Sequence, residues 1–393
     1  MVAMENSSSG KTRFWNDEKT RGIIYQIATA AAVAFIGYYL ISNVQENMAK
    51  QSIASGFDFL GKEAAFEIGE TPIEYSAADS YGRALVIGVL NTLKVSVVGM
   101  ILTTMLGTFV GVCTLSKNLL VSKLGRSYVE IFQNVPVLLQ LFFFYALFYE
   151  AFPGPRQALK PIPGMFFSNR GVDFGIPAPH YAWSYMAIAF FAACILSFFI
   201  SRWARKRQEK TGQQFPSFWT GFFLLVGLPL ITWGFCGAPT EMNVPVLKGF
   251  NFQGGFNISP EFSALLIGLV LYTASFIAQI VRAGIQSISH GQTEAAMSIG
   301  LKGKHVLSLV IFPQAMRVIV PPLTSQLLNL TKNSSLAVAI GYPDFVQVAG
   351  TTINQTGQAV EGVALMMMVY LTLSLLTSAF MNWYNKKIAI VER

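Results

Sequence analysis

Charged residues are scarce in this chain. Only 12% of its 393 residues are charged, against about 25% in soluble domains, and 53% are hydrophobic. The mean hydropathy is +0.48. This composition argues against an ordinary soluble domain and predicts a membrane protein.

Cysteine and histidine are also rare, with three residues of each type. Cys113, Cys194 and Cys236 lie in apolar surroundings, which argues against a disulfide framework. The histidines lack metal-ligand spacing, and no nucleophile is paired with a base. We therefore expect no metal site, no bound cofactor and no enzymatic activity. The net charge of +8 comes from short loops between apolar runs rather than from one basic face, so it does not predict nucleic-acid binding.

A complete nucleotide-binding motif is missing as well. Residues 7–12 read SSSGKT and match only the end of the phosphate-binding loop G-x-x-x-x-G-K-[ST]. Glu5 stands where that loop needs its first glycine, and no strand pattern precedes it. We therefore expect no ATPase in this chain.

Long apolar runs are abundant, and each is long enough for a helix of about 20 residues to cross the hydrocarbon layer. The first run is longer than the apolar part of a typical signal peptide, so we expect it to be retained as a span. The sequence predicts an all-α polytopic membrane protein with about eight transmembrane helices. The predicted spans are 22–44, 85–112, 128–149, 183–200, 217–237, 261–281, 318–340 and 363–384.

Positive charge sets the predicted orientation of these spans. If the N-terminus is cytosolic, most of the 28 lysines and arginines fall on inside segments. Cytosolic loops carry such an excess in membrane proteins. We therefore expect both termini in the cytosol. The acidic stretch at 63–79 then lies outside, where we expect a solvated face.

The loop between the sixth and seventh spans contains the sequence EAAMSIG. Ala295 and Ala296 give a short helix a low-profile face that can lie in a groove of a partner. Glu294 supplies a charge, and Gly300 suits a helix C-terminus that needs a left-handed residue. We expect a second short helix at 302–311.

The spacing of these residues resembles the loop by which membrane subunits of ATP-binding-cassette (ABC) importers engage their ATPase. The family pattern is EAA, three residues, Gly, nine residues and Ile-x-Leu-Pro. Val310 and Phe312 stand in for Ile and Leu here, and Pro313 is kept. The resemblance implies a coupling helix that ATP-driven closure of the ATPase moves as a lever. An ordinary amphipathic loop helix is the alternative.

Three longer segments, 132–145, 278–296 and 313–336, resemble polar-amino-acid ABC permeases, in particular those of the general L-amino-acid importers. The resemblance implies a non-catalytic permease subunit of the cell inner membrane with a five-helix type I importer core. It also implies two ATP-binding subunits that hold ATP and Mg, a second and different permease subunit, a periplasmic solute-binding protein and an amino-acid substrate.

The expected organisation combines this core with additional segments. The extra pair of spans, with its basic loop, is either a lipid-facing support or a docking surface, and we favour a support. The expected parts are a cytosolic tail (1–21), an extra span with a periplasmic segment (22–82), the first part of the core (83–149), an insertion with periplasmic loops and two extra spans (150–260), the second part of the core (261–388) with its coupling loop at about 282–317, and a cytosolic tail (389–393).

Polar residues within the spans are candidates for the substrate path, because they are too costly to face lipid. Lys332 could meet a substrate carboxylate, or it could form an internal ion pair or extend to the membrane surface. Asn134, before Pro136, could instead satisfy backbone groups freed at a kink. The substrate-path candidates are Gln140, Gln279, Asn329, Lys332, Asn333, Ser334 and Ser335.

Two of these candidates depart from the pattern of the resembling family. Its members often have Glu at the position of Gln279 and Asp at that of Asn333. Acidic groups there would suit a cationic ligand. The two amides therefore favour neutral or acidic amino acids, or a broad range.

An ion-gradient-driven secondary amino-acid transporter is the alternative function. Such a transporter would need carboxylates inside its spans for ion coupling, and internal repeats are common in that class. The sequence contains no convincing repeat, and Glu130 lies near the end of a span.

Overall fold

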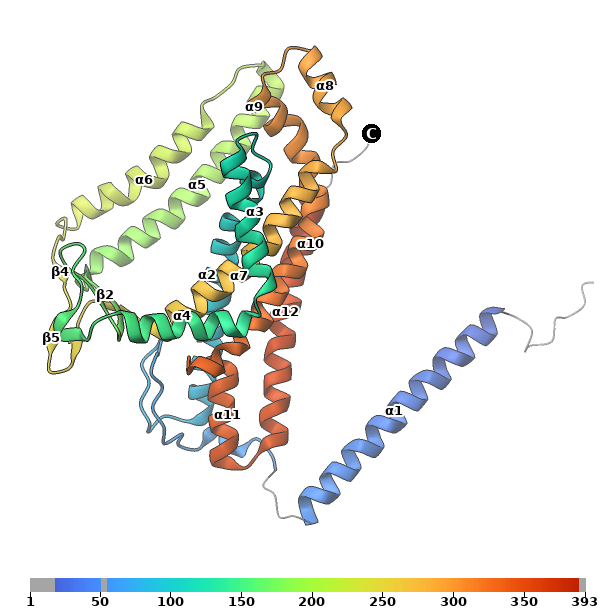
Figure 1. Cartoon of the computed structure of the whole chain (residues 1–393), viewed down its shortest axis with the longest axis vertical. Helices are drawn as coiled ribbons and strands as arrows, with labels where there is room; N and C mark the ends of the chain where they lie inside the picture. Colours follow the sequence, from blue (N-terminus) through green and yellow to red (C-terminus); the bar gives the residue numbers. More distant parts are fainter. Residues whose placement is uncertain (1–17, 51–54, 389–393) are drawn as a thin grey trace, which may run out of the picture. The chain divides into compact units, whose positions relative to one another are not determined.

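The computed structural model describes residues 18–50 and 55–388, most of which form long helices (Figure 1). Residues 1–17, which include the SSSGKT sequence, and the expected 389–393 tail lie outside the described residues. The helices are α1 (Glu18–Lys50), η2 (Asp58–Gly61), α2 (Tyr81–Thr114), α3 (Leu119–Asn134), α4 (Val137–Ala151), η3 (Pro155–Gln157), α5 (Tyr181–Thr211), α6 (Ser217–Phe235), α7 (Pro260–Gln286), α8 (His290–Ser298), α9 (Gly303–His305), η4 (Val306–Ile311), α10 (Phe312–Asn333), η5 (Ser334–Ile340), α11 (Phe345–Thr356) and α12 (Ala359–Ile388).

The predicted spans coincide with these helices. Within the described residues, seven helices are long and apolar enough to cross a membrane, or eight spans if the bent pair α3–α4 counts as one. The prediction of a helical polytopic protein with about eight spans is therefore confirmed. Its boundaries are less accurate, because α5 continues to Thr211, well beyond the predicted end at residue 200.

The third predicted span, 128–149, is divided between two helices, with a break at the position where the sequence suggested a kink. α3 and α4 meet at an angle of 103°. Val135 adopts an extended conformation, with φ −95° and ψ 127°, and precedes Pro136. The proline ring disfavours a helical conformation in the residue before it, so the helix ends there.

Two side-chain amides satisfy backbone carbonyls freed at this break. Asn134 Nδ2 donates a 2.7 Å hydrogen bond to the carbonyl of Glu130. Gln140 Nε2 donates 2.9 Å hydrogen bonds to the carbonyls of Phe132 and Val135. Gln140 is only 5% exposed, so water has little access to its amide. The amide therefore supplies the hydrogen bonds that these two carbonyls would otherwise lack.

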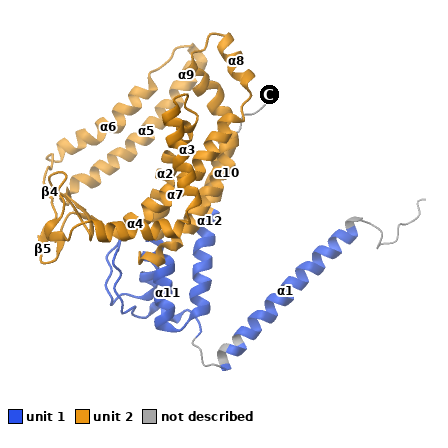
Figure 2. Ribbon diagram, in the orientation of Figure 1, with its two compact units in different colours: residues 1–91, 343–375 blue, residues 92–342, 376–393 orange. Residues whose placement is uncertain are grey.

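The chain divides into two compact units (Figure 2). Unit 1 contains residues 1–91 and 343–375, and thus α1, the segment that follows it, the first turns of α2, α11 and part of α12. Segments far apart in the sequence therefore share one core. Its buried residues are Phe59, Ala64, Ile68, Tyr81, Ala84, Leu85, Ile87, Phe345, Val348 and Ala349.

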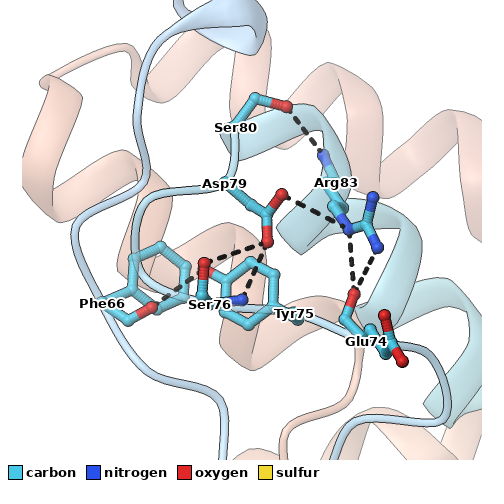
Figure 3. A network of polar contacts seen from close by, with 7 residues as sticks. All are labelled: Phe66, Glu74, Tyr75, Ser76, Asp79, Ser80 and Arg83. Carbon is cyan, nitrogen blue, oxygen red and sulfur yellow. Dashed lines mark hydrogen bonds and ion pairs between the residues drawn. The ribbon is translucent and has the colours of Figure 1, made fainter.

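A polar network orders the acidic stretch of unit 1 (Figure 3). Arg83 donates hydrogen bonds to the Glu74 carbonyl, and its Nε lies 3.6 Å from Asp79 Oδ1. Asp79 Oδ2 accepts a 2.8 Å hydrogen bond from the Ser76 amide. Asp79 is therefore a structural residue of this segment and not only part of a solvated face.

A buried carboxylate begins α11 in the same unit. Asp344 is 0% exposed and accepts hydrogen bonds from the Gln347 amide, at 2.9 Å, and the Tyr370 hydroxyl, at 3.0 Å. Burial raises the pKa of the Asp344 carboxyl to about 6, and the hydrogen bonds only partly oppose this rise.

Unit 2 contains residues 92–342 and 376–393, and α7 is its most buried span, at 61%. α4, α10 and α3 all pack on α7. α2 approaches it closely, since a Cβ atom added to Gly107 would lie 2.6 Å from Ile277 Cβ. Small residues permit such close helix packing in membranes.

α5 and α6 pack on each other, but only 6% and 0% of their spans are buried. The two helices form the α5–α6 hairpin of the predicted insertion. Short antiparallel strands lie at the end of the hairpin where α5 begins and α6 ends (Figure 1). We call them the strand cap; they were not predicted from the sequence. The strands are β1 (Met165–Ser168), β2 (Gly171–Phe174), β3 (Ile176–Pro177), β4 (Met242–Asn243), β5 (Val246–Lys248), β6 (Asn251–Gln253) and β7 (Phe256–Ile258), paired as β1-β2-β7, β3-β4 and β5-β6.

Candidate functional site

The predicted coupling loop connects α7 to α10. α8 carries the EAA sequence, with Ala296 only 5% exposed and Ala295 exposed. The Glu294 side chain is 73% exposed, and its Oε1 lies 3.3 Å from His290 Nδ1. Ala296 therefore packs inward, while Glu294 and Ala295 form an outer face.

Gly300 ends α8 in the left-handed conformation, with φ +84°. Its amide donates a 2.9 Å hydrogen bond to the Met297 carbonyl, and the Leu301 amide donates one of 3.2 Å to the Ala296 carbonyl. These two bonds define the Schellman helix end, in which glycine is the usual left-handed residue. The predicted conformation of Gly300 is confirmed.

The second half of the loop is continuous with a span. α9, η4 and α10 follow one another without a gap, and η4 has π-helical geometry. The predicted short helix at 302–311 is thus present as the beginning of a longer one. A displacement of α8 would reach α10 through one short connection, at 299–302.

Two apolar side chains of the loop are largely exposed to solvent. Met297 is 54% exposed and Ile299 is 77% exposed. Met297 lies in the last turn of α8, and Ile299 directly precedes Gly300.

The end of α10 and the beginning of η5 carry the predicted polar cluster. Ser334 is 0% exposed, and its hydroxyl donates to the Thr331 carbonyl at 2.7 Å. Ser335 donates similarly to the Lys332 carbonyl at 2.7 Å. These two hydroxyls are therefore satisfied within the helix. Asn329 and Lys332 remain exposed and Asn333 is half-buried.

A polar cavity of about 210 Å³ lies between α3 and α7, and we call it the α3–α7 pocket. It is next to the end of α7 from which the chain enters the coupling loop. Two guanidinium groups and one carboxylate give it charges of both signs. Its lining residues are Thr114, Arg126, Val129, Glu130, Ala278, Gln279 and Arg282.

Gln279 joins the two helices beside this pocket. Its Nε2 donates a 2.8 Å hydrogen bond to Oε1 of Gln133 on α3. In the described part of the chain, the buried Nε2 of Gln133 has no hydrogen-bond acceptor. The Gln133 amide thus retains an unused donor close to the pocket.

The seven predicted substrate-path residues do not meet in one cavity. Gln279 lines the α3–α7 pocket. Gln140 lines a separate, mostly apolar cavity of about 330 Å³, and its amide is engaged at the helix break. The residues of α10 and η5, at 329 and 332–335, line neither cavity.

Four residues at or beside the pocket were not predicted from the sequence: Arg126, Glu130, Gln133 and Arg282. Helical spacing contained a usable signal, because Arg126 and Glu130 are four residues apart on α3. Gln279 and Arg282 are three apart on α7, so each pair shares a helix face. The sequence did not show that α3 packs against α7, so the two pairs could not be assigned to one pocket.

Comparison with known proteins agrees with this architecture. Residues 210–390 match the family model of the binding-protein-dependent transport system inner membrane component. The general L-amino acid transport system permease protein AapQ of Rhizobium johnstonii is 47% identical over 96% of this chain and 94% of its own length. The glutamate/glutamine/aspartate/asparagine transport system permease protein BztB of Rhodobacter capsulatus is 42% identical over 96% of both chains. The chain therefore belongs to this family of amino-acid ABC transporter permeases, as a multi-pass inner membrane subunit that works with a binding protein and with partner subunits that hydrolyse ATP.

Proposed function

We propose that this permease imports L-amino acids with neutral polar or acidic side chains, within a broad substrate range, and that the α3–α7 pocket is a station on their path. The charges lining the pocket are the observation that carries this proposal. The names of AapQ, a general L-amino acid permease, and of BztB, a glutamate/glutamine/aspartate/asparagine permease, point to the same substrates.

The pocket matches the common part of every amino-acid substrate. Arg126 and Arg282 can receive carboxylates, because a guanidinium binds them through paired hydrogen bonds. Glu130 can receive the ammonium group. Gln279 and Gln133 add neutral amides, which suit a polar side chain better than a cationic one.

The coupling loop supplies the proposed link to ATP hydrolysis. Met297 and Ile299 would enter a groove of an ATPase subunit, and Glu294 would pair with a basic group there. The continuity from α9 to α10 would then transmit the movement into the membrane. Two ATPase subunits would act on two permeases in this way.

The exposed polar residues of α10 support a two-permease arrangement. Asn329 and Lys332 are too polar to face lipid, so we assign them to a path shared with a second, different permease subunit. The excess of positive residues on inside segments supports cytosolic placement of both termini and of the coupling loop.

Uptake and competition by the reconstituted complex test the proposed substrate range. We expect glutamate, glutamine, aspartate and asparagine to compete for radiolabelled glutamine uptake, and lysine to compete poorly. Competition by lysine alone would refute the proposed range. The Gln279→Ala variant should raise the half-saturating substrate concentration, whereas Gln286→Ala, an exposed change further along α7, should leave it unchanged.

A further inference from the structure

The end of α5 that joins α6 is the most strongly basic part of the described chain. The predicted apolar span ends at residue 200, but the helix continues for eleven residues to Thr211. At 1.5 Å per residue this extension rises about 16 Å. The polar layer of a bilayer is about 5–8 Å thick on each side. The extension therefore passes through the headgroups.

Three cations form a stripe on this extension. Arg202, Lys206 and Lys210 are spaced by four residues, so they lie on one side of the helix, and all three are exposed. The exposed Arg205 and Glu209 lie near the same side, and their charges cancel, so the side keeps a net positive charge. Ala204, roughly opposite them, is 5% exposed and packs inward. Across residues 18–50 and 55–388, no acidic side chain forms an ion pair with this basic stripe.

Aromatic residues mark the depth of the stripe. Trp203, Phe218 and Trp219 are 51%, 75% and 58% exposed at this end of the hairpin. Trp is enriched at membrane interfaces, where its polar edge reaches the headgroups. The neighbouring Arg207 lies over the Trp203 ring at 5.4 Å and donates to Gln213, so its guanidinium is already engaged.

We propose that the basic stripe binds the phosphate groups of anionic phospholipids in the surrounding leaflet. The α5–α6 hairpin buries almost none of its span surface within this chain, so its neighbour in the membrane is not supplied by the chain itself. A row of exposed cations at headgroup depth is complementary to an anionic lipid surface, and each such residue contributes to its attraction. Phosphate binding there would fix the depth and tilt of the hairpin.

Lipid titration of the purified complex tests this proposal. Native mass spectrometry would follow binding of phosphatidylglycerol and phosphatidylcholine to the complex of permeases and ATPase subunits. We expect phosphatidylglycerol to bind more tightly, and its affinity to fall at least about tenfold in the variant without the stripe, because three surface cations that each contribute to the attraction are lost. That variant is Arg202→Gln, Lys206→Gln, Lys210→Gln.

The strand cap offers a matched control with the same charge loss at the other end of the hairpin. Lys160, Arg170 and Lys248 are exposed there and are again two lysines and one arginine. Their replacement by Gln should leave phosphatidylglycerol binding unchanged. Arg202→Lys, Lys206→Arg, Lys210→Arg changes the same three side chains but keeps their charge and should retain binding, which separates the loss of charge from misfolding.

Two results would overturn the proposal. The first is unchanged phosphatidylglycerol affinity in the stripe variant; loss of the ATPase subunits from that variant would then identify the stripe as a protein-docking surface. The second is equal affinity for phosphatidylcholine in the unmodified complex.

Discussion

The side-chain amide of Gln279 donates a 2.8 Å hydrogen bond to the side-chain oxygen of Gln133. This bond connects α7 to α3 beside the α3–α7 pocket. Both groups are neutral, so the charge of the pocket is set by Arg126, Arg282 and Glu130. Their net charge is +1, and an added carboxylate at position 279 would cancel it.

Replacing Gln279 by Glu should shift the substrate preference toward cationic amino acids. We expect lysine and arginine to become effective competitors and the apparent affinity for glutamate to fall about tenfold, a change of about 1.4 kcal/mol. Competition assays on the reconstituted complex measure both effects. The Gln286→Glu variant adds the same charge further along α7 and should behave like the unmodified protein. An identical shift in both variants would argue against a local role for position 279.

The break between α3 and α4 should depend on Gln140. In Gln140→Leu the carbonyls of Phe132 and Val135 lose their amide donors. A buried polar group without a partner costs about 1–3 kcal/mol, so we expect a lower melting temperature in detergent. Asn134→Ala removes one bond at an exposed position and should have a smaller effect. Equal melting temperatures for Gln140→Leu and the unmodified protein would contradict this role.

Gly300 should tolerate only residues that accept the left-handed conformation. Its φ of +84° is unfavourable for a β-branched side chain, although a Cβ atom would have open space. We expect Gly300→Val to abolish uptake while the amount of permease in the membrane stays normal. Gly300→Asn should retain most of the uptake, because Asn adopts this conformation more readily. Uptake and immunoblots of membrane fractions provide the test. Normal uptake by Gly300→Val would contradict the claim that uptake requires the Schellman helix end.

The spans and the coupling loop could be predicted because their signals are local. About 20 consecutive apolar residues define a span, and the spacing of the EAA sequence and Gly300 lies within one short segment. The conformation of Gly300 followed from the fact that glycine readily accepts a left-handed helix end. The position of the kink could also be partly predicted, since Pro136 disfavours a helical conformation at Val135 and Asn134 lies just before them.

Features that depend on pairing between distant segments could not be predicted. The core of unit 1 combines Phe59 and Ile87 with Phe345, and no local pattern identifies these residues as neighbours. The pocket required α3 to lie against α7. The strand cap consists of very short strands, whose alternation is too brief to recognise. The angle at Pro136 depends on packing against α7, which a helix-breaking residue does not specify.

Asp344 should make the stability of unit 1 dependent on pH. Its pKa in the folded protein, about 6, exceeds the ordinary value of 3.8, so the folded state binds more protons than the unfolded state between these values. The contribution of Asp344 to the free energy of unfolding is therefore fully present below pH 3.8. It decreases as the pH rises from 3.8 and is lost as the pH passes about 6. The total loss from this residue is about 3 kcal/mol.

Thermal unfolding between pH 4 and pH 7 measures this contribution. We expect Asp344→Asn to remove the part of the pH dependence that Asp344 causes and to stabilise the protein relative to the unmodified chain near pH 7. Asp58→Asn alters an exposed carboxylate of the same unit and serves as the control. The same pH profile for Asp344→Asn and the unmodified protein would contradict the assignment.

Cross-linking of the coupling loop to the ATPase tests the central claim most directly. Ile299, at 77% exposure, would be replaced by Cys in a chain without Cys113, Cys194 and Cys236 and combined with single cysteines along the ATPase groove. Phe250→Cys on the strand cap, where Phe250 is 71% exposed, is the control. The account predicts an oxidative cross-link from position 299 and none from position 250, with uptake blocked by the cross-link and restored by reduction. Absence of any cross-link from position 299, in a complex that still imports amino acids with ATP, would contradict it.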